Sequence, residues 1–335
     1  MSVPAVSARA LRLSALTVGI FLLFSFARPN TFPTVLNFQL MAFSLPEAVL
    51  FTLAITITML TGGIDLSIVS VSNAASLVAV WVMAAMGRSG AGIVVGLVAG
   101  LGVAMVCGVI NGLLVAKARI TPILATLATM QLLNGVSVAL TNGKPLTKLP
   151  STFTAFGTGK LLGVPLPLLL MLLATLALGF VIRRTRVGVE LHLLGDNPLA
   201  ARYAGLGTTR LILIAYTVSA LLAGIAGLLI ASRTASASAD FGKSYVLGSI
   251  VIAVLAGVRT EGGRATVGGV LLAGVCLQGL TSGLNSVGAS PFVYLILQGA
   301  LLLFVMGLDN LRPRQRRAIP AAAPAPQETV EQLTV

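Results

Sequence analysis

Two carboxylates stand within or beside strongly apolar stretches of the sequence, Glu47 and Asp65. Each can be placed at the end of a predicted membrane span. Ionisable side chains at membrane depth are costly, and those that occur there often belong to solute, ion or proton pathways. Direct contact with a solute or an ion is therefore one interpretation of Asp65.

The residues around Asp65 also support a structural interpretation. Residues 61–70 read TGGIDLSIVS. Gly62 and Gly63 allow the backbone to turn, and the Asp65 side chain is then placed to cap a helix that begins near Leu66, where its charge suits the positive helix end. The pattern favours capping at a helix break over direct contact, and both interpretations stay open at this stage.

The residues needed for catalysis or metal binding are largely missing. There is one histidine, His192, and no H-E-x-x-H or G-x-S-x-G motif. Cys107 and Cys276 fall inside predicted spans, without the number or spacing of a metal site or a disulfide framework. No G-x-x-x-x-G-K-[ST] phosphate loop occurs. We therefore expect no catalytic residue, no metal site and no cofactor bound by this chain.

The composition is that of a membrane protein. Of 335 residues, 56% are hydrophobic and only 9% are charged, with a mean hydropathy of +1.00, whereas soluble domains carry roughly 25% charged residues. A membrane helix needs about 20 mainly apolar residues. Windows of that length predict an all-α polytopic membrane protein of about ten transmembrane helices with discontinuous Gly-rich segments: 13–28, 44–61, 68–87, 91–116, 120–140, 161–182, 209–231, 245–258, 266–286 and 290–308.

The charge distribution predicts the orientation. The net charge is +13, and with ten spans most of the 22 basic residues fall on the side that holds both termini. This bias favours a cytoplasmic location for both ends and explains the basic charge without nucleic acid. We expect a cytoplasmic N-terminus over residues 1–12, one membrane domain over 13–310, and a cytoplasmic, Pro/Ala-rich, disordered tail over 311–335. The polar segment 141–160 is expected to be a plain outer loop; the alternative is a segment that closes over a solute entrance or meets an external partner.

The connection over residues 183–210 contains the signals of a short helix. Asn197 is a good N-cap and Pro198 suits the first helical position. Residues 199–204 supply about one and a half turns at roughly 3.6 residues per turn, and Gly205 suits the left-handed residue after a helix. We interpret this cytoplasmic helix as a docking element for a motor protein; the alternative is an ordinary loop helix.

Amide side chains within or near the spans are the other polar candidates. A buried amide in hydrocarbon needs a hydrogen-bond partner, so each serves either as contact between helices or as lining of a solute path. With the Gly-rich break, the candidates for a helix break or translocation path are Gly62, Gly63, Asp65, Ser67, Asn73, Asn111, Asn134 and Asn285.

Several long segments resemble a known family, the membrane permeases of ribose-type ABC importers, which also serve xylose, galactose, rhamnose and autoinducer. They are TGGIDLSIVSV (61–71), GVINGLLVAKARITPILATLATMQLLNGV (108–136), GDNPLAARYAGL (195–206), YTVSALLAGIAGLLIASRTASA (216–237) and GSIVIAVLAGVRTEGGRATVGGVLLAG (248–274). The resemblance covers about residues 45–310. It implies an importer in the bacterial cytoplasmic (inner) membrane for a sugar or sugar-like solute.

The resemblance also implies partners. They are a second permease, a cytoplasmic ABC ATPase that carries the ATP and Mg, and an extracytoplasmic solute-binding protein, with no nucleic acid. Segment 195–206 would be the coupling helix that contacts the ATPase, through Asp196, Asn197, Pro198, Ala201, Arg202, Tyr203 and Gly205.

The sequence departs from the family pattern at Val69, at Tyr245-Val246-Leu247 and at residues 256–260. Homodimer and heterodimer therefore both remain open. The alternatives are a branched-chain amino-acid ABC permease and an ion-coupled secondary carrier. The second is disfavoured because, of nine acidic residues, only Glu47 and Asp65 lie near span interiors.

Overall fold

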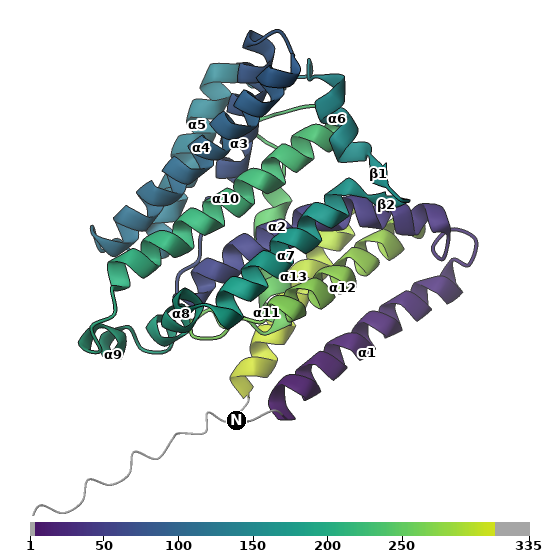
Figure 1. The fold of residues 1–335 in the computed structure, drawn as a ribbon. Coiled ribbons are helices and arrows are strands. Elements are labelled where there is room, and N and C mark those ends of the chain that lie inside the picture. Colours follow the sequence, from purple (N-terminus) through teal and green to yellow (C-terminus); the bar gives the residue numbers. More distant parts are fainter. Residues whose placement is uncertain (1–3, 312–335) are drawn as a thin grey trace, which may run out of the picture.

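The computed structural model describes residues 4–311, and within that range the fold is almost entirely helical (Figure 1). This confirms the predicted all-α class. The elements in order are α1 (Pro4–Ala27), α2 (Val35–Leu60), α3 (Ile68–Ala85), α4 (Gly90–Ala116), α5 (Pro122–Thr141), α6 (Ser151–Thr158), β1 (Lys160–Leu161), β2 (Val164–Pro165), α7 (Leu166–Arg184), α8 (Arg186–Asp196), α9 (Pro198–Tyr203), α10 (Thr208–Thr234), α11 (Lys243–Ala256), α12 (Val267–Ser286) and α13 (Pro291–Leu311).

Eight helices of the described range are long and apolar enough to cross a membrane: α1, α2, α3, α4, α5, α7, α10 and α12. The other two expected spans correspond to α11 and α13. α11 has 14 residues, or about 21 Å of helix, which is less than the roughly 30 Å of a hydrocarbon layer. The predicted span 245–258 is therefore a short helix that does not cross by itself.

Four segments contain more helix than the sequence suggested. α1 begins at Pro4, inside the segment expected to precede the membrane domain. α2 begins at Val35, nine residues before the predicted span, because Thr34 caps it by accepting from the Asn37 amide at 3.2 Å. The expected plain loop 141–160 contains α6 and leads into the β1–β2 hairpin, and the 183–210 connection contains α8 as well as α9. The predicted tail over 311–335 lies almost wholly outside the described residues.

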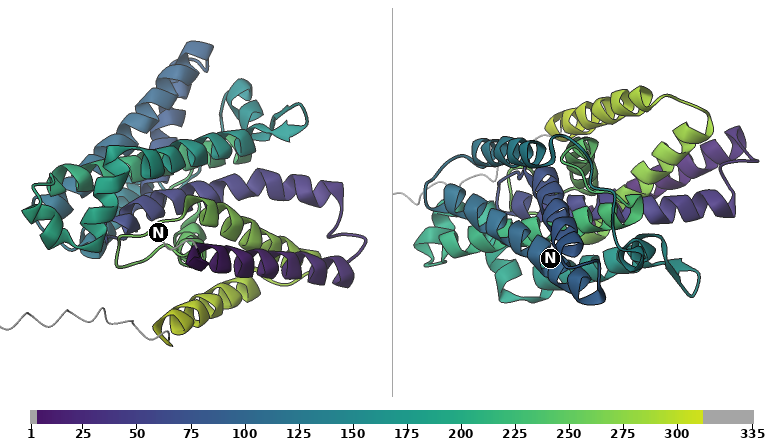
Figure 2. Two further views of the ribbon diagram at one scale, coloured as in Figure 1. Left: turned by 60° about the horizontal axis from the view of Figure 1, so that its bottom comes forward. Right: turned by 90° about the horizontal axis from the view of Figure 1, so that it is seen from above.

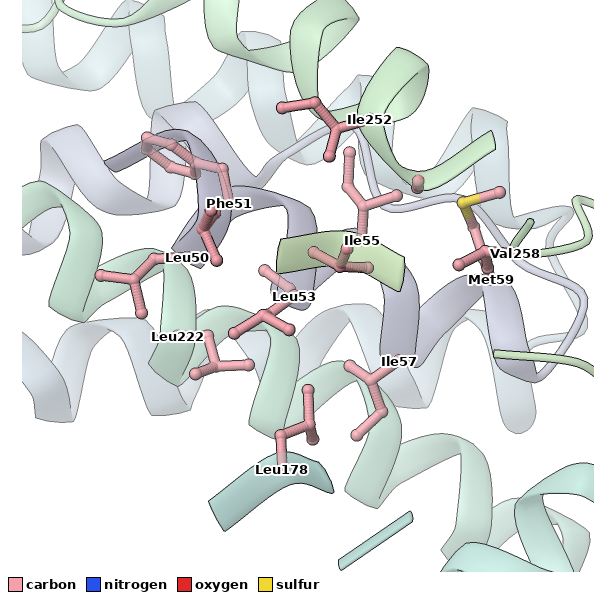
Figure 3. Close-up of a cluster of buried hydrophobic side chains, with 14 of the residues drawn as sticks. Leu50, Phe51, Leu53, Ile55, Ile57, Met59, Leu178, Leu222, Ile252 and Val258 are labelled. Atoms are coloured by element: carbon pink, nitrogen blue, oxygen red, sulfur yellow. The ribbon is translucent and has the colours of Figure 1, made fainter. Parts of the chain in front are cut away.

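α2 occupies the centre of the largest hydrophobic cluster (Figure 3). Side chains from opposite faces of α2 are fully buried, so helices must surround it. Figure 3 shows them next to side chains from three other helices, and the labelled contacts on α2 are Leu50, Phe51, Leu53, Ile55, Ile57 and Met59, with Leu178 from α7, Leu222 from α10 and Ile252 from α11.

Small residues bring neighbouring helices into close contact. Gly96 and Gly100 of α4 lie against the carbonyl oxygens of Ala79 and Ala75 on α3, at positions where a Cβ would come within 2.7 and 2.6 Å. Close backbone approach of this kind is a main way in which helices associate in lipid. Figure 2 shows α1, at the purple end of the colour scale, on the outside of the bundle; it packs against α12.

Candidate functional site

The predicted helix break separates α2 from α3. α2 ends at Leu60 and α3 begins at Ile68. Gly62 has a φ of +82°, a backbone conformation that side chains with a Cβ rarely adopt. Gly63 faces α5 and α10: a Cβ there would lie 3.1 Å from the ring of Pro122 and 2.5 Å from the Tyr216 hydroxyl. The break is thus enclosed by other helices.

Asp65 is completely buried inside this break. Its Oδ1 accepts from the Ser67 amide at 2.9 Å and from the Ser67 hydroxyl at 2.6 Å, and its Oδ2 accepts from the Ser219 hydroxyl on α10 at 3.3 Å. The helix expected near Leu66 begins two residues later, at Ile68, with Ser67 as its N-cap residue. Asp65 instead holds the amide two residues ahead, as Asp side chains do in tight turns.

The hydrogen bonds continue from Asp65 into two further helices. The Asn111 amide on α4 donates to the Ser67 hydroxyl at 2.8 Å, and the Thr129 hydroxyl on α5 donates to the Asn111 carbonyl oxygen at 2.6 Å. We call Asp65, Ser67, Asn111, Thr129 and Ser219 the Asp65 cluster. It joins the break to α4, α5 and α10 through uncharged donors.

The remaining amide candidates lie elsewhere. Asn73 on α3 donates to the carbonyl oxygens of Ala239 and Phe241 at 2.8 and 2.9 Å, and so holds the connection between α10 and α11. Asn134 is half-buried on α5 and takes no part in the Asp65 cluster. Asn285 is exposed in the last turn of α12, about 27 Å along that helix from its start. The structure does not bring Asn285 to the break.

Glu47 forms a second buried site that the sequence did not reveal. It was placed at a span end, but α2 extends 12 residues before it, so it lies in the helix interior with 1% exposure. Arg233 of α10 donates to both of its oxygens, at 2.5 and 3.0 Å, and the Tyr245 hydroxyl of α11 donates at 2.6 Å. We call these three residues the Glu47 cluster. The sequence did contain a signal for this ion pair: an acidic residue, Glu47, in an apolar span, and an arginine, Arg233, near the end of another predicted span.

The predicted short helix is confirmed as α9. Asn197 Oδ1 accepts from the amides of Leu199 and Ala200 at 3.1 and 3.0 Å, and Pro198 is the first helical residue. Gly205 follows with a φ of +75°, which ends the helix. The helix begins at Pro198, as expected, and ends at Tyr203, one residue before the predicted end, with Ala204 as C-cap residue.

α9 presents one side to the protein and the other to its surroundings. Ala201 is buried at 4% exposure, whereas Arg202 and Asp196 are exposed and Tyr203 is 85% exposed. Figure 1 shows α9 at one end of the bundle, which we call the α9 end. Beside it, a cavity of about 380 Å³ opens between α8 and the start of α10, with Arg186, Glu190 and Arg210 in its lining.

Comparison with known proteins identifies the family. Residues 38–306 match the family described as the permease component of branched-chain amino acid transport systems. The ribose import permease of Bacillus subtilis (strain 168) is 36% identical over 263 residues, which are 78% of this chain and 80% of that relative. The ribose import permease of Escherichia coli (strain K12) is 33% identical over 78% of this chain and 81% of that protein.

Two further relatives carry other names. The L-arabinose ABC transporter permease of Azospirillum brasilense is 30% identical over 82% of this chain and 78% of its own length. The autoinducer 2 import permease of Yersinia enterocolitica is 30% identical over 76% of this chain and 77% of its own length. No solved structure matches. The resemblance drawn from the sequence is thereby confirmed: this multi-pass membrane protein belongs to the permease family of ribose-type ABC importers.

Proposed function

We propose that this chain is the translocating permease of an ATP-driven importer for a sugar or sugar-like solute. The observation that carries the proposal is the similarity to permeases named for ribose, L-arabinose and autoinducer 2 import, which in each case spans three quarters or more of both chains. The matching family is described by branched-chain amino acid transport, so an amino acid is the competing solute. The proposal takes its solute class from the names of the individual relatives, because each of them matches this chain over most of its length.

The proposed energy source is a separate ABC ATPase that docks at the α9 end. Two features support this. α9 exposes an aromatic ring and a guanidinium, Tyr203 and Arg202, and these residue types are enriched in protein interfaces. In the cavity next to it Arg186 pairs with Glu190 at 2.7 Å, and Arg210 supplies a further positive charge that can receive an acidic side chain of a partner. The α9 end then faces the cytoplasm of a bacterium.

The opposite end of the bundle would receive the solute from an extracytoplasmic binding protein. A second permease, identical or related, would complete the translocation unit. This chain itself would bind no ATP or Mg, because both belong to the ATPase.

The two buried carboxylates support an ATP-driven cycle over ion coupling. Ion-coupled carriers need ionisable groups that exchange their ion during transport. Here Glu47 is held by Arg233 and Tyr245, and Asp65 is held by three uncharged donors in a closed environment. Both carboxylates are thus engaged within the chain.

The decisive experiment reconstitutes the permease in proteoliposomes with its ATPase and binding protein. We expect uptake of labelled ribose or arabinose that requires ATP, with no uptake of leucine. A gradient of protons or sodium should not replace ATP. Uptake by the permease alone, driven by such a gradient, would refute the proposal, and uptake of leucine instead of sugar would favour the amino-acid alternative.

Docking through α9 has its own test in the same vesicles. Arg202→Glu reverses an exposed charge and should abolish sugar uptake while membrane insertion stays normal. Gly205→Val should act similarly, because a β-branched residue tolerates a φ of +75° poorly. Lys117→Glu, the same reversal at an exposed residue after α4, is the control. Normal uptake by both α9 variants would place the ATPase contact elsewhere.

A further inference from the structure

Three backbone segments from distant parts of the sequence meet at the α9 end. They are the end of α2 and the first residues of the break, the end of α8 at Gly195, and the loop between α11 and α12 at residues 261–263. The Gly263 amide donates to the Leu60 carbonyl oxygen at 3.0 Å. This hydrogen bond joins the α11–α12 loop to the last residue of α2.

The three segments are packed without room for side chains at their contact points. A Cβ on Gly195 would overlap the Leu60 carbonyl oxygen and the Gly263 amide nitrogen. A Cβ on Gly262 would lie 2.8 Å from the Gly195 carbonyl oxygen and 2.9 Å from the Gly62 nitrogen. Each segment is therefore in backbone contact with the other two. We call Leu60, Gly62, Gly195, Gly262 and Gly263 the glycine junction.

α9 follows the glycine junction directly. Gly195 is separated from the α9 cap, Asn197, by Asp196 alone. The Asp196 side chain is itself in the contact, because a Cβ on Gly263 would overlap its Oδ1. α9 is short, capped by Asn197 and attached to the close-packed glycine junction by one intervening residue. It therefore has little freedom to move without displacing that junction.

The other side of the glycine junction leads to the break. Leu60 and Gly62 precede Asp65, whose cluster joins α4, α5 and α10. Gly262 and Gly263 lie between α11 and α12. The junction thus connects α9 to the ends of four helices, α2, α3, α11 and α12, through backbone contacts that resist compression.

We propose that the glycine junction transmits the movement of α9 to the α2–α3 break and to α11, and so couples the ATPase to the solute path. The inference rests on the proposed function, since it assumes an ATPase at α9. Gly195 and Gly262 act in it as positioning residues, and Asp196 acts through its contact with Gly263. A mere packing role would affect stability alone, whereas transmission affects the number of ATP molecules hydrolysed per solute imported.

The test compares variants in proteoliposomes with ATPase and binding protein, measuring ATP hydrolysis and sugar uptake together. Gly195→Ala should keep ATP hydrolysis but raise the ATP used per sugar by about tenfold, a usual size for coupling between two sites. Gly262→Ala should do the same. Gly268→Ala is the matched control, since a Cβ on this α12 glycine meets nothing within 4 Å, and it should leave the ratio unchanged.

Asp196 decides the outcome if the glycine variants do not assemble. Asp196→Ala removes atoms and creates no overlap; it should raise the ATP used per sugar, and Asp196→Asn, which keeps the Oδ1 contact, should restore the wild-type ratio. A wild-type ratio in assembled Gly195→Ala or in Asp196→Ala would overturn the inference. Absence of ATP-dependent uptake by the wild-type complex would instead refute the proposed function.

Discussion

Asp65 and Glu47 are carboxylates buried to the same extent, at 0% and 1% exposure, but their surroundings differ in charge. Glu47 accepts two hydrogen bonds from the Arg233 guanidinium and one from the Tyr245 hydroxyl. Asp65 receives one backbone amide and two hydroxyls, and no ion pair joins it to a cationic side chain within residues 4–311. Glu47 is neutralised by a single opposite charge, whereas Asp65 is held by hydrogen bonds from uncharged donors alone.

This difference in charge determines how strongly the stability of each cluster depends on any one of its residues. A buried ion pair depends on both partners, because removal of one leaves an uncompensated charge. A set of neutral hydrogen bonds is divided among several residues, so each loss is smaller. We therefore expect the Glu47 cluster to determine stability, and the Asp65 cluster to tolerate conservative change while it holds the break in position.

Arg233→Met should have the largest effect. It leaves the Glu47 carboxylate buried without its cation, so we expect the free energy of unfolding to fall by about 3 to 5 kcal/mol. Titration of the purified permease with a denaturing detergent in mixed micelles measures the change. The double variant Glu47→Gln with Arg233→Met should recover most of the loss. If the double variant is no more stable than Arg233→Met, the charge is not the cause.

Asp65→Ala should have the next largest effect. It removes the acceptor of three hydrogen bonds and leaves the Ser67 amide buried without a partner, so we expect a loss of about 2 kcal/mol in the free energy of unfolding. Asp65→Asn keeps an acceptor for that amide and should cost less. Sugar uptake separates the two roles of Asp65: retained uptake in Asp65→Asn indicates a backbone role, and lost uptake with normal insertion indicates that the charge is needed.

Tyr245→Phe should weaken the Glu47 cluster without dissolving it. The variant loses the hydroxyl that donates to Glu47 but keeps the ring that stacks on Phe51, with centroids 5.4 Å apart. Since Arg233 remains, we expect a loss of about 1 kcal/mol. The same detergent titration checks this value. A loss equal to that of Arg233→Met would show that the tyrosine, and not the guanidinium, dominates the cluster.

Thr129→Val should have the smallest effect. It removes one hydrogen bond to Asn111 at the far end of the Asp65 cluster and preserves the shape of the side chain. Hydrogen bonds between membrane helices contribute about 0.6 kcal/mol on average, and we expect a loss of that order. A loss as large as that of Asp65→Ala would mean that the five residues act as one unit, contrary to the comparison.

The sequence predicted the local features of the candidate site well. The break after α2 and the cap of α9 both depend on local features of the chain. The break requires the backbone freedom of Gly62, and the cap requires that Asn197 reach two amides within the next three residues. The short α11 was not predicted as such: residues 245–258 were expected to form a span, whereas α11 has only 14 residues. Asp65 was placed at the break, but the helix was predicted to begin near Leu66, whereas α3 begins at Ile68 with Ser67 as its N-cap residue.

The partners of buried groups were not predictable from the sequence. Glu47 and Arg233 are 186 residues apart, and Asn111 and Ser67 are 44 residues apart. Each polar residue in an apolar span needs a partner, but many residues could serve. Asn285 looked like an equal candidate and proved to be exposed at the end of α12.

The sequence alone was enough to predict a helical membrane protein with a Gly-rich break and a short capped helix, because span length, backbone freedom and caps arise within a few neighbouring residues, and its resemblance to known permeases supplied the function. The tertiary structure was needed to show which cation neutralises Glu47, which hydroxyls surround Asp65, and that Gly195 meets Leu60 and Gly262. Those contacts depend on how the helices pack, and in lipid this packing is decided by close fit and by the need to pair every buried polar group.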